Sequence, residues 1–323
     1  MTLVRSVARL HGRQTETGSL CVRAPGALRR LISSTQGTRL GPYITPQTFE
    51  LSTDDGSLAS GKREYDDGEA FFRNFPDVEV AAVVAGRRVL DLGCGFGGRT
   101  VWYAERGAER VMGLEISPKM VDRCRAFAEQ HGMDNVEFVV GIAEDLPYED
   151  NSIDVVITYD VLEHVQDPAQ AMCEIARVLQ PDGSAWLVFP SYLGGRASHL
   201  DYLTQIPFLH RVFDPDVIIP VVNESLTTEP ERYGVKAQPP ARVTPVGRRA
   251  LPTLNGMNRA EAEAFLDRAG LEVEWSHAGP LFTETARLPL SGPASRAMDR
   301  LGVVGRVPDA LVGHLAYRVR RRG

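Results

Sequence analysis

Long apolar runs, lysine and cysteine are all scarce in this sequence of 323 residues. No stretch approaches the roughly 18 consecutive apolar residues of a membrane-spanning helix, so no membrane span is expected. The net charge of −6 argues against a nucleic-acid partner, because phosphate contacts need Lys and Arg. Cysteine occurs only at Cys21, Cys94, Cys124 and Cys173, without a CxxC pair or a metal-like spacing. That pattern favours free thiols in the cytoplasm and argues against a zinc or iron–sulfur site.

Arginine dominates the start of the chain. Residues 1–40 hold seven Arg and a single acid, Glu16. An Arg-rich, acid-poor start is typical of an organellar transit peptide. Arg also replaces Lys throughout the chain, however, which points to the codon bias of a GC-rich, bacterial genome. We therefore expect a poorly structured extension over residues 1–60, with one short helix near residues 27–33.

The middle of the chain alternates short apolar runs with helical patterns. The apolar runs predict five strands, at residues 87–92, 109–116, 136–143, 153–158 and 184–190. Helical patterns lie before and between them, at residues 63–85, where Pro76 interrupts the pattern, and at 100–106, 117–131 and 169–179. Strands that alternate with helices predict a doubly wound α/β fold, in which a parallel sheet is covered on both faces.

The alternation stops after the fifth predicted strand. Residues 191–256 are rich in proline and aromatics and are too long for a simple connection, so they predict an insertion or lid. Asn258 and Glu261 form a capping pattern at the start of a helix over residues 257–270, and strands follow at 271–277 and 314–322. The sequence thus predicts four segments, namely the extension at 1–60, the core at 61–190, the insertion at 191–256 and a sheet-completing part at 257–323.

Four glycines follow the first predicted strand, in the stretch VLDLGCGFGGRT at residues 89–100. A bare backbone between a strand and a helix lets a ligand approach the peptide groups and the helix N-terminus. The pattern alone leaves the ligand open. Gly93, Gly95 and Gly98 satisfy the GxGxxG of NAD and FAD sites, whereas Gly93, Gly95 and Gly97 satisfy GxGxG.

Further motifs close the later strands. Asp91 precedes the first glycine and Glu115 ends the second strand, while GIAEDLP (141–147) and YDVLEHVQDP (159–168) follow the third and fourth. Together with the glycine stretch, these motifs resemble the class I S-adenosylmethionine-dependent methyltransferases that act on small molecules. The resemblance covers residues 87–190. It implies a Rossmann-like, seven-stranded, mostly parallel sheet with an antiparallel last strand, and methyl transfer to an O, N or C atom of a small-molecule acceptor.

The resemblance also implies how S-adenosylmethionine is held at the first two strands. The backbone of Gly93, Gly95 and Gly97 would pass close to the methionine part of the cofactor. Asp91 would help hold its ammonium group, directly or through water. Glu115 would accept hydrogen bonds from both ribose hydroxyls.

The adenine end of the cofactor is implied to lie over the second and third strands. Ile116 would lie against the adenine face and the backbone N–H of Ala143 would meet the adenine edge. The family often carries Asp just before this alanine, whereas this chain has Ile142. Either Glu144 substitutes for that acid, or packing and backbone alone hold the adenine. The carbonyl of Tyr159 would face the cofactor's amino group.

His164, which follows the fourth strand, is a candidate general base because its ordinary pKa suits proton removal near neutrality. The alternative is that it only braces its loop. Asp160, Glu163 and His164 also resemble the E-x-x-E-H pattern that ubiquinone-type O-methyltransferases link to magnesium. Mg²⁺ is therefore a minor hypothesis, and helix capping by Asp160 with a buried Glu163–His164 contact is the alternative; no metal ligand is assigned.

The insertion supplies two rival bases. His199 and His210 stand among the aromatic residues of 191–215, which could line an acceptor pocket or simply form a small core of their own. TYDV at residues 158–161 replaces the Asn/Asp-Pro-Pro-aromatic segment of DNA amino-methylases, which disfavours that substrate. Two other functions stay open: a non-catalytic S-adenosylmethionine-binding regulator, which Ile142 keeps in view, and an NAD-dependent oxidoreductase.

Overall fold

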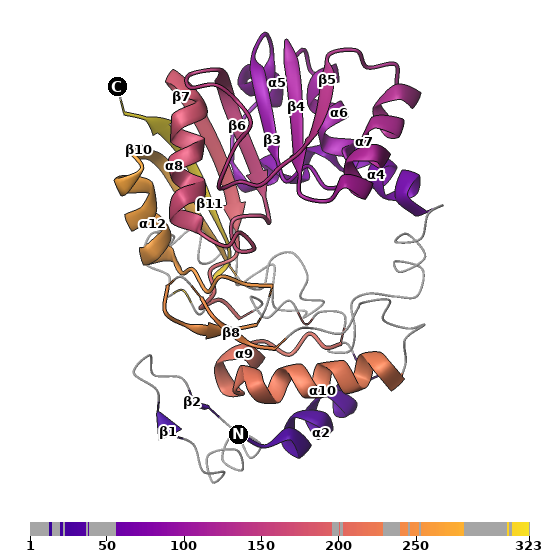
Figure 1. The fold of residues 1–323 in the computed structure, drawn as a ribbon, viewed down its shortest axis with the longest axis vertical. Coiled ribbons are helices and arrows are strands. Elements are labelled where there is room, and N and C mark those ends of the chain that lie inside the picture. The colour runs from indigo at the N-terminus through magenta and orange to yellow at the C-terminus, as the bar shows by residue number, and fades with distance from the viewer. Residues whose placement is uncertain are drawn as a thin grey trace.

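The structure is a computed structural model of the 323-residue chain. It describes residues 13–14, 20–21, 23–36, 38, 56–195, 200, 203–228, 240–244, 246–251, 253–280, 309 and 312–322. Figure 1 shows an α/β sheet with helices on both faces and, facing one edge of that sheet, a smaller helical part built around α10 and α2. No helix in these described ranges is long and apolar enough to cross a membrane.

The main sheet has seven strands in the order β10-β11-β7-β6-β3-β4-β5. Their bounds are β3 (Arg88–Leu92), β4 (Arg110–Glu115), β5 (Val136–Val140), β6 (Ile153–Tyr159), β7 (Leu179–Phe189), β10 (Leu271–Pro280) and β11 (Val312–Arg321). The pairs among β3 to β7 are parallel, whereas β11 runs antiparallel to both β7 and β10. This confirms the predicted mostly parallel sheet with an antiparallel last strand.

Alternate residues of the central strands enter different cores. Val89 and Val111 pack with α5 (Val80–Val84) and α6 (Gly98–Glu105). Their chain neighbours Leu90 and Met112 pack on the opposite face with α8 (Pro168–Val178) and α12 (Arg259–Arg268). Because both faces are covered, these strands are mostly apolar between their ends, which is why the sequence shows them as near-continuous apolar runs.

Local capping patterns set where the helices begin. Ser117 accepts a hydrogen bond from the Met120 N–H at the start of α7 (Pro118–Gln130). Asn258 and Glu261 form the predicted capping box of α12. Residues 181–183 lie within the bounds of β7, where Asp182 takes a φ of 69° and the pairing with β6 shifts register. The residues bulge out and the strand continues.

The helical stretch predicted at 63–85 is broken into several pieces. The chain forms α4 (Gly56–Asp66), two short 3-10 turns at Gly68–Ala70 and Phe72–Asn74, and then α5. Pro76 and Asp77, whose φ is 60°, end the helical path before α5. In Figure 1, α4 lies beside α6 and α7 at one side of the sheet.

The smaller part has a core of its own, formed by α2 (Pro25–Thr35), α9 (Leu209–Val212), α10 (Pro215–Thr228) and nearby segments. The sequence predicted a short helix near residues 27–33 within an otherwise poorly structured extension, and α2 lies at that place. In the structure Leu28 and Ile32 are buried against the insertion, and Arg29 pairs with Glu224 of α10. The helix is ordered because its apolar face is covered by a segment that lies far away in the sequence.

Two pairings of two-residue strands and the cysteines complete the description of these residues. β1 (Arg13–Gln14) pairs with β2 (Leu20–Cys21), and β8 (Arg242–Val243) pairs with β9 (Arg249–Ala250). The thiols of Cys94, Cys124 and Cys173 are free.

Candidate functional site

The glycine stretch forms a tight turn between β3 and α6. Gly93 and Gly97 take φ values of 77° and 79°, in the left-handed region that side chains disfavour. A Cβ at Gly93 would lie 2.2 Å from the Val161 side chain, and one at Gly97 would lie 2.9 Å from Cys124. Glycine is therefore required on both conformational and steric grounds, and the peptide backbone is left bare at the edge of the sheet.

Asp91 lies beneath this turn rather than on it. It is 5% exposed, and its Oδ2 accepts a hydrogen bond of 2.6 Å from the Thr100 hydroxyl. Burial raises the pKa of the Asp91 carboxyl, while Arg99 and the Thr100 hydrogen bond oppose that shift. One oxygen of the carboxylate is therefore held at the start of α6.

A second acid, Glu64, reaches the same turn from α4. Its Oε2 accepts a hydrogen bond of 3.3 Å from the Gly98 N–H, and its Oε1 lies 4.0 Å from Nη2 of Arg99. Burial raises the pKa of the Glu64 carboxyl, Arg99 opposes this shift, and nearby Asp91 adds to it. Sequence analysis missed Glu64, because nothing in its neighbourhood distinguishes it from the other charged residues of a surface helix.

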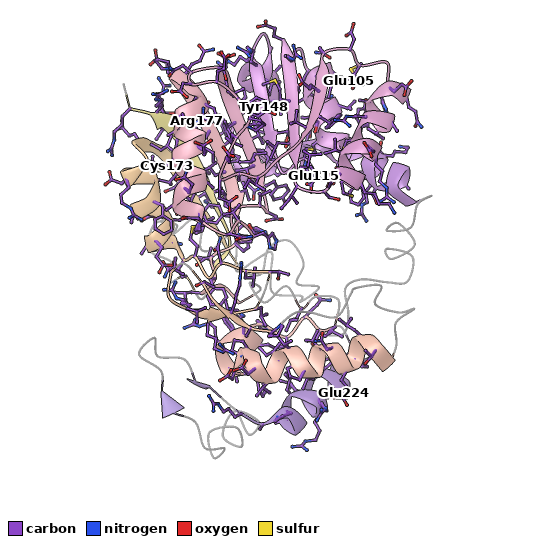
Figure 2. The ribbon with its side chains drawn as sticks, in the orientation of Figure 1. Glu105, Glu115, Tyr148, Cys173, Arg177 and Glu224 are labelled. Carbon is purple, nitrogen blue, oxygen red and sulfur yellow. The ribbon has the colours of Figure 1, made fainter. Side chains whose placement is uncertain are left out.

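Glu115 stands at the end of β4, next to the glycine turn. Its Oε1 accepts a hydrogen bond of 3.1 Å from the Ser117 N–H, which orients the carboxylate before any ligand arrives. Figure 2 shows Glu115 at the sheet edge that faces the α10 part of the molecule. Its position fits a carboxylate that receives the two hydroxyls of a ribose.

Apolar side chains lie exposed beside Glu115. Ile116 is 69% exposed and Ile142 is 44% exposed, both unusual for isoleucine. They follow the ends of neighbouring strands β4 and β5, and Ala143 is buried beside them. Two exposed isoleucines at adjoining strand ends form an apolar surface suited to a flat aromatic base.

The Glu144 carboxylate makes hydrogen bonds within its own part of the fold, rather than the adenine contact considered for it. Its Oε1 accepts hydrogen bonds from the N–H groups of Gln166 and Asp167, at 2.6 and 3.1 Å, just before α8. This arrangement supports the second alternative for adenine, namely packing and backbone alone. The rest of the loop is fixed by Arg177, which donates to the carbonyl of Leu146 at 2.9 Å; Figure 2 shows Arg177 on α8.

The segment after β6 brings several titratable groups together. Asp160 takes a φ of 56°, rare for a residue other than glycine, and its Oδ1 lies 3.4 Å from Nε2 of His314 on β11. Glu163 is buried, and burial together with the nearby Asp160 raises the pKa of its carboxyl well above the ordinary range. His314 is a residue that sequence analysis missed, because β11 follows β6 by some 150 positions.

The candidate bases are placed differently from one another. Nδ1 of His164 lies 2.6 Å from the Thr253 carbonyl and Nε2 lies 3.7 Å from Glu163, so the ring links the loop after β6 to the segment before α12. Nε2 of His210 lies 2.7 Å from the Tyr192 carbonyl inside the insertion. His199 lies outside the described residues.

Metal-binding geometry is not found around Asp160 or elsewhere in the described ranges, where no three His, Cys, Asp or Glu side chains are grouped to hold an ion.

Tyr159, the last residue of β6, packs its ring beneath Arg99, whose Cζ lies 5.3 Å from the ring centroid. This contact ties the end of β6 to the start of α6.

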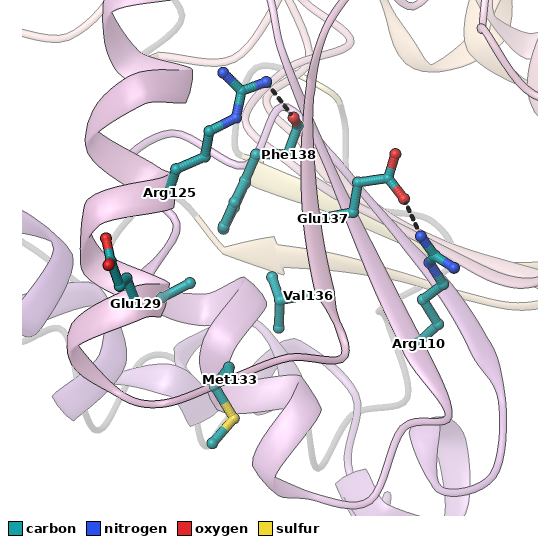
Figure 3. A pocket seen from close by; sticks show the side chains of 8 residues that line it. Arg110, Arg125, Glu129, Met133, Val136, Glu137 and Phe138 are labelled. Atoms are coloured by element: carbon teal, nitrogen blue, oxygen red, sulfur yellow. Dashed lines mark hydrogen bonds and ion pairs between the residues drawn. The ribbon is translucent and has the colours of Figure 1, made fainter.

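A surface pocket of about 540 Å³ lies away from these groups, between α7 and β5 (Figure 3). Arg125 donates to the Phe138 carbonyl at 2.8 Å across it, and Arg110 pairs with Glu137 at its side. Arg110 begins β4, whereas Glu115 ends it. The pocket therefore opens toward the opposite end of the strands and is not part of the candidate site.

Comparison with known proteins agrees with this geometry. Residues 90–187 match the family described as "Methyltransferase domain". Norajmaline N-methyltransferase from Rauvolfia serpentina is 34% identical over 142 residues, which are 44% of this chain and 47% of that protein. An uncharacterized methyltransferase from Mycobacterium tuberculosis is 42% identical over 105 residues, 32% of this chain and 40% of its own length. The matched part thus spans less than half of each relative.

A solved structure from Listeria monocytogenes, described as a "putative S-adenosylmethionine dependent methyltransferase", superposes with a TM-score of 0.50. It covers 82% of this chain and 99% of its own, at 16% identity, so the likeness concerns the fold. Residues 90–187 thus match a methyltransferase domain, and the chain shares its fold with this solved structure.

Proposed function

We propose that this protein transfers a methyl group from S-adenosylmethionine to an O, N or C atom of a small molecule. The observation that carries the proposal is the juxtaposition, at one sheet edge, of the bare turn at 93–97, the pre-oriented Glu115 and the exposed Ile116. Each group matches one part of the cofactor: amino-acid tail, ribose and adenine. In a doubly wound sheet, ligands bind outside the carboxyl ends of the strands, which is where these groups meet.

The adenosine part would be held by residues of β4, β5 and the loops that follow them. Glu115 would accept both ribose hydroxyls, and the Ser117 N–H already fixes its carboxylate. The adenine would lie against Ile116 and Ile142, with its edge at the Ala143 backbone. Because Glu144 is engaged before α8, we assign adenine recognition to packing and backbone.

The cofactor supplies an activated methyl group on a sulfonium, so the protein's main task is to orient the acceptor. Correct orientation alone can contribute about 7–11 kcal/mol to a reaction of this type. The insertion at 191–256 and α2 would supply the acceptor side, since both lie in the part that faces the sheet edge (Figure 1). The plant relative is named for N-methylation of norajmaline, which supports a small-molecule acceptor.

Proton removal from the acceptor is not assigned to a single histidine. His164 bridges two segments through the Thr253 carbonyl, which supports a bracing role as well as a basic one. His210 is buried against Tyr192, which favours a structural role. His199 stays a prediction from the sequence.

Binding measurements on Glu115 test the proposal. We expect Glu115→Ala to weaken binding of S-adenosylhomocysteine in calorimetry at least about tenfold, since even one hydrogen bond to a charged group contributes about 1.5–3 kcal/mol. Glu137→Gln is a matched control, because Glu137 is an exposed strand glutamate at the far pocket. Affinity for the cofactor that survives Glu115→Ala would contradict the proposed site.

Turnover separates methyl transfer from the second candidate, a non-catalytic S-adenosylmethionine-binding regulator. Ile142 at the usual acid position favours this second candidate. Incubation with methyl-labelled cofactor and a broad panel of small molecules should give a labelled product if the protein is an enzyme. Tight binding of the cofactor with no labelled product, across that panel and a host extract, would favour the regulator.

A further inference from the structure

We propose that Glu64 of α4 selects the charge of the ligand's tail, binding the ammonium of an amino-acid tail and excluding phosphates from the glycine turn. The inference rests on the proposed function, because it concerns the same nucleotide site. It assigns a specificity role to a helix outside the matched methyltransferase domain, which spans residues 90–187.

The position of the carboxylate carries the first step. Glu64 Oε2 lies 3.3 Å from the Gly98 N–H, the first peptide group of α6. A Cβ added at Gly95 would lie 3.1 Å from Glu64 Oε1, so the other oxygen lies over the middle of the turn. The carboxylate therefore occupies the place where a dinucleotide-binding loop would hold a pyrophosphate, at the N-terminus of the following helix.

The rigidity of α4 carries the second step. A Cβ at Gly98 would lie 2.0 Å from the Gly61 carbonyl and 2.6 Å from the Tyr65 N–H. The two helices thus meet backbone to backbone at this point, one turn or less from Glu64. The backbone that carries Glu64 is therefore held against the turn, and the carboxylate stays beside the Gly98 N–H unless its side chain changes rotamer.

The balance of charge carries the third step. Asp91, which the sequence suggested for the ammonium, is 5% exposed and accepts the Thr100 hydroxyl at 2.6 Å. The Glu64 side chain is 15% exposed and is the carboxylate that reaches the turn itself. Arg99 is the guanidinium that faces both acids. Two carboxylates around one guanidinium favour a ligand that brings a positive group, as an α-amino acid does.

The test compares ligands that share an adenosine and differ in the tail. S-adenosylhomocysteine carries an ammonium and a carboxylate, 5′-methylthioadenosine carries neither, and ADP carries phosphates. We expect Glu64→Gln to weaken S-adenosylhomocysteine at least about tenfold in calorimetry, to leave 5′-methylthioadenosine within about twofold, and to strengthen ADP. Glu64→Asp keeps the charge and should retain most of the preference for the amino-acid tail.

Asp66→Asn is the matched control, because Asp66 lies on the same helix and its exposed carboxylate pairs with Lys62. It should change none of the three affinities. Equal weakening of S-adenosylhomocysteine and 5′-methylthioadenosine in Glu64→Gln would show that α4 acts only by packing and would overturn the inference, as would unchanged affinities for S-adenosylhomocysteine and ADP. Failure of the parent protein to bind any adenosine ligand would instead overturn the proposed function, and this inference with it.

Discussion

A methyl group at position 98 would collide with the backbone of α4. The Cβ of Gly98→Ala would lie 2.0 Å from the Gly61 carbonyl, whereas real Cβ contacts essentially never fall below 3.0 Å. The helices must therefore separate by at least the difference, 3.0 − 2.0 = 1.0 Å. Backbone cannot rotate away as a side chain can, so the strain falls on the docking of α4 against α6.

The size of the effect follows from the cost of overpacking. Such clashes cost about 1–3 kcal/mol, which corresponds to a fall in Tm of roughly 2–12 °C at about 2–4 °C per kcal/mol for chains of 150–250 residues. Alanine is otherwise the better helix former by about 1 kcal/mol, which offsets part of this cost, so a net fall in Tm must come from the clash. Displacement of Glu64 should also weaken binding of S-adenosylhomocysteine.

Differential scanning calorimetry with and without S-adenosylhomocysteine measures both effects. Gly26→Ala is the matched control, since Gly26 also lies in the first turn of a helix, α2, and its Cβ would meet only the Arg30 side chain, at 3.7 Å. That variant should keep or slightly raise the Tm. Gly98→Ala with the parent's Tm and the parent's affinity would refute the close docking of α4.

Three further substitutions test other parts of the fold. Glu163→Gln should be more stable than the parent, by an amount that grows as the pH rises above about 4.5, the ordinary pKa of this carboxyl. Above that pH the unfolded parent releases the Glu163 proton, whereas the folded parent retains it because its pKa is raised. Parallel stability curves for the two proteins from pH 4.5 to 8 in urea titrations would contradict this. Thr100→Val should cost about 1–3 kcal/mol in the same titrations by removing the donor to buried Asp91, and no loss would mean that the carboxylate finds another donor. Asn258→Ala should lower the free energy of unfolding by about 1 kcal/mol, because the capping box with Glu261 is lost. Amide hydrogen exchange in the first turn of α12 should become faster. Unchanged exchange there would count against the cap.

Much of the core could be predicted because its signals are local. The β-branched run at 153–158 and the glycines at 93–98 record their own burial and backbone conformation, so they predicted β6 and the turn after β3. The stretch at 63–85 shows the limit of such signals, because the interruption at Pro76 was predicted and the break at Gly68 was not. The hydrogen bond between Thr100 and the Asp91 carboxylate was likewise not predicted.

The amino-acid sequence by itself determined the alternation of strands and helices, the bare turn after β3 and the acid at the end of β4, because each depends on the residues next to it. Only the tertiary structure decided that Glu64 meets this turn, that α2 is buried against the insertion, and that Asp160 faces His314. Those contacts join segments far apart in the chain, and their partners are chosen by how helices and strands pack, which no local periodicity records.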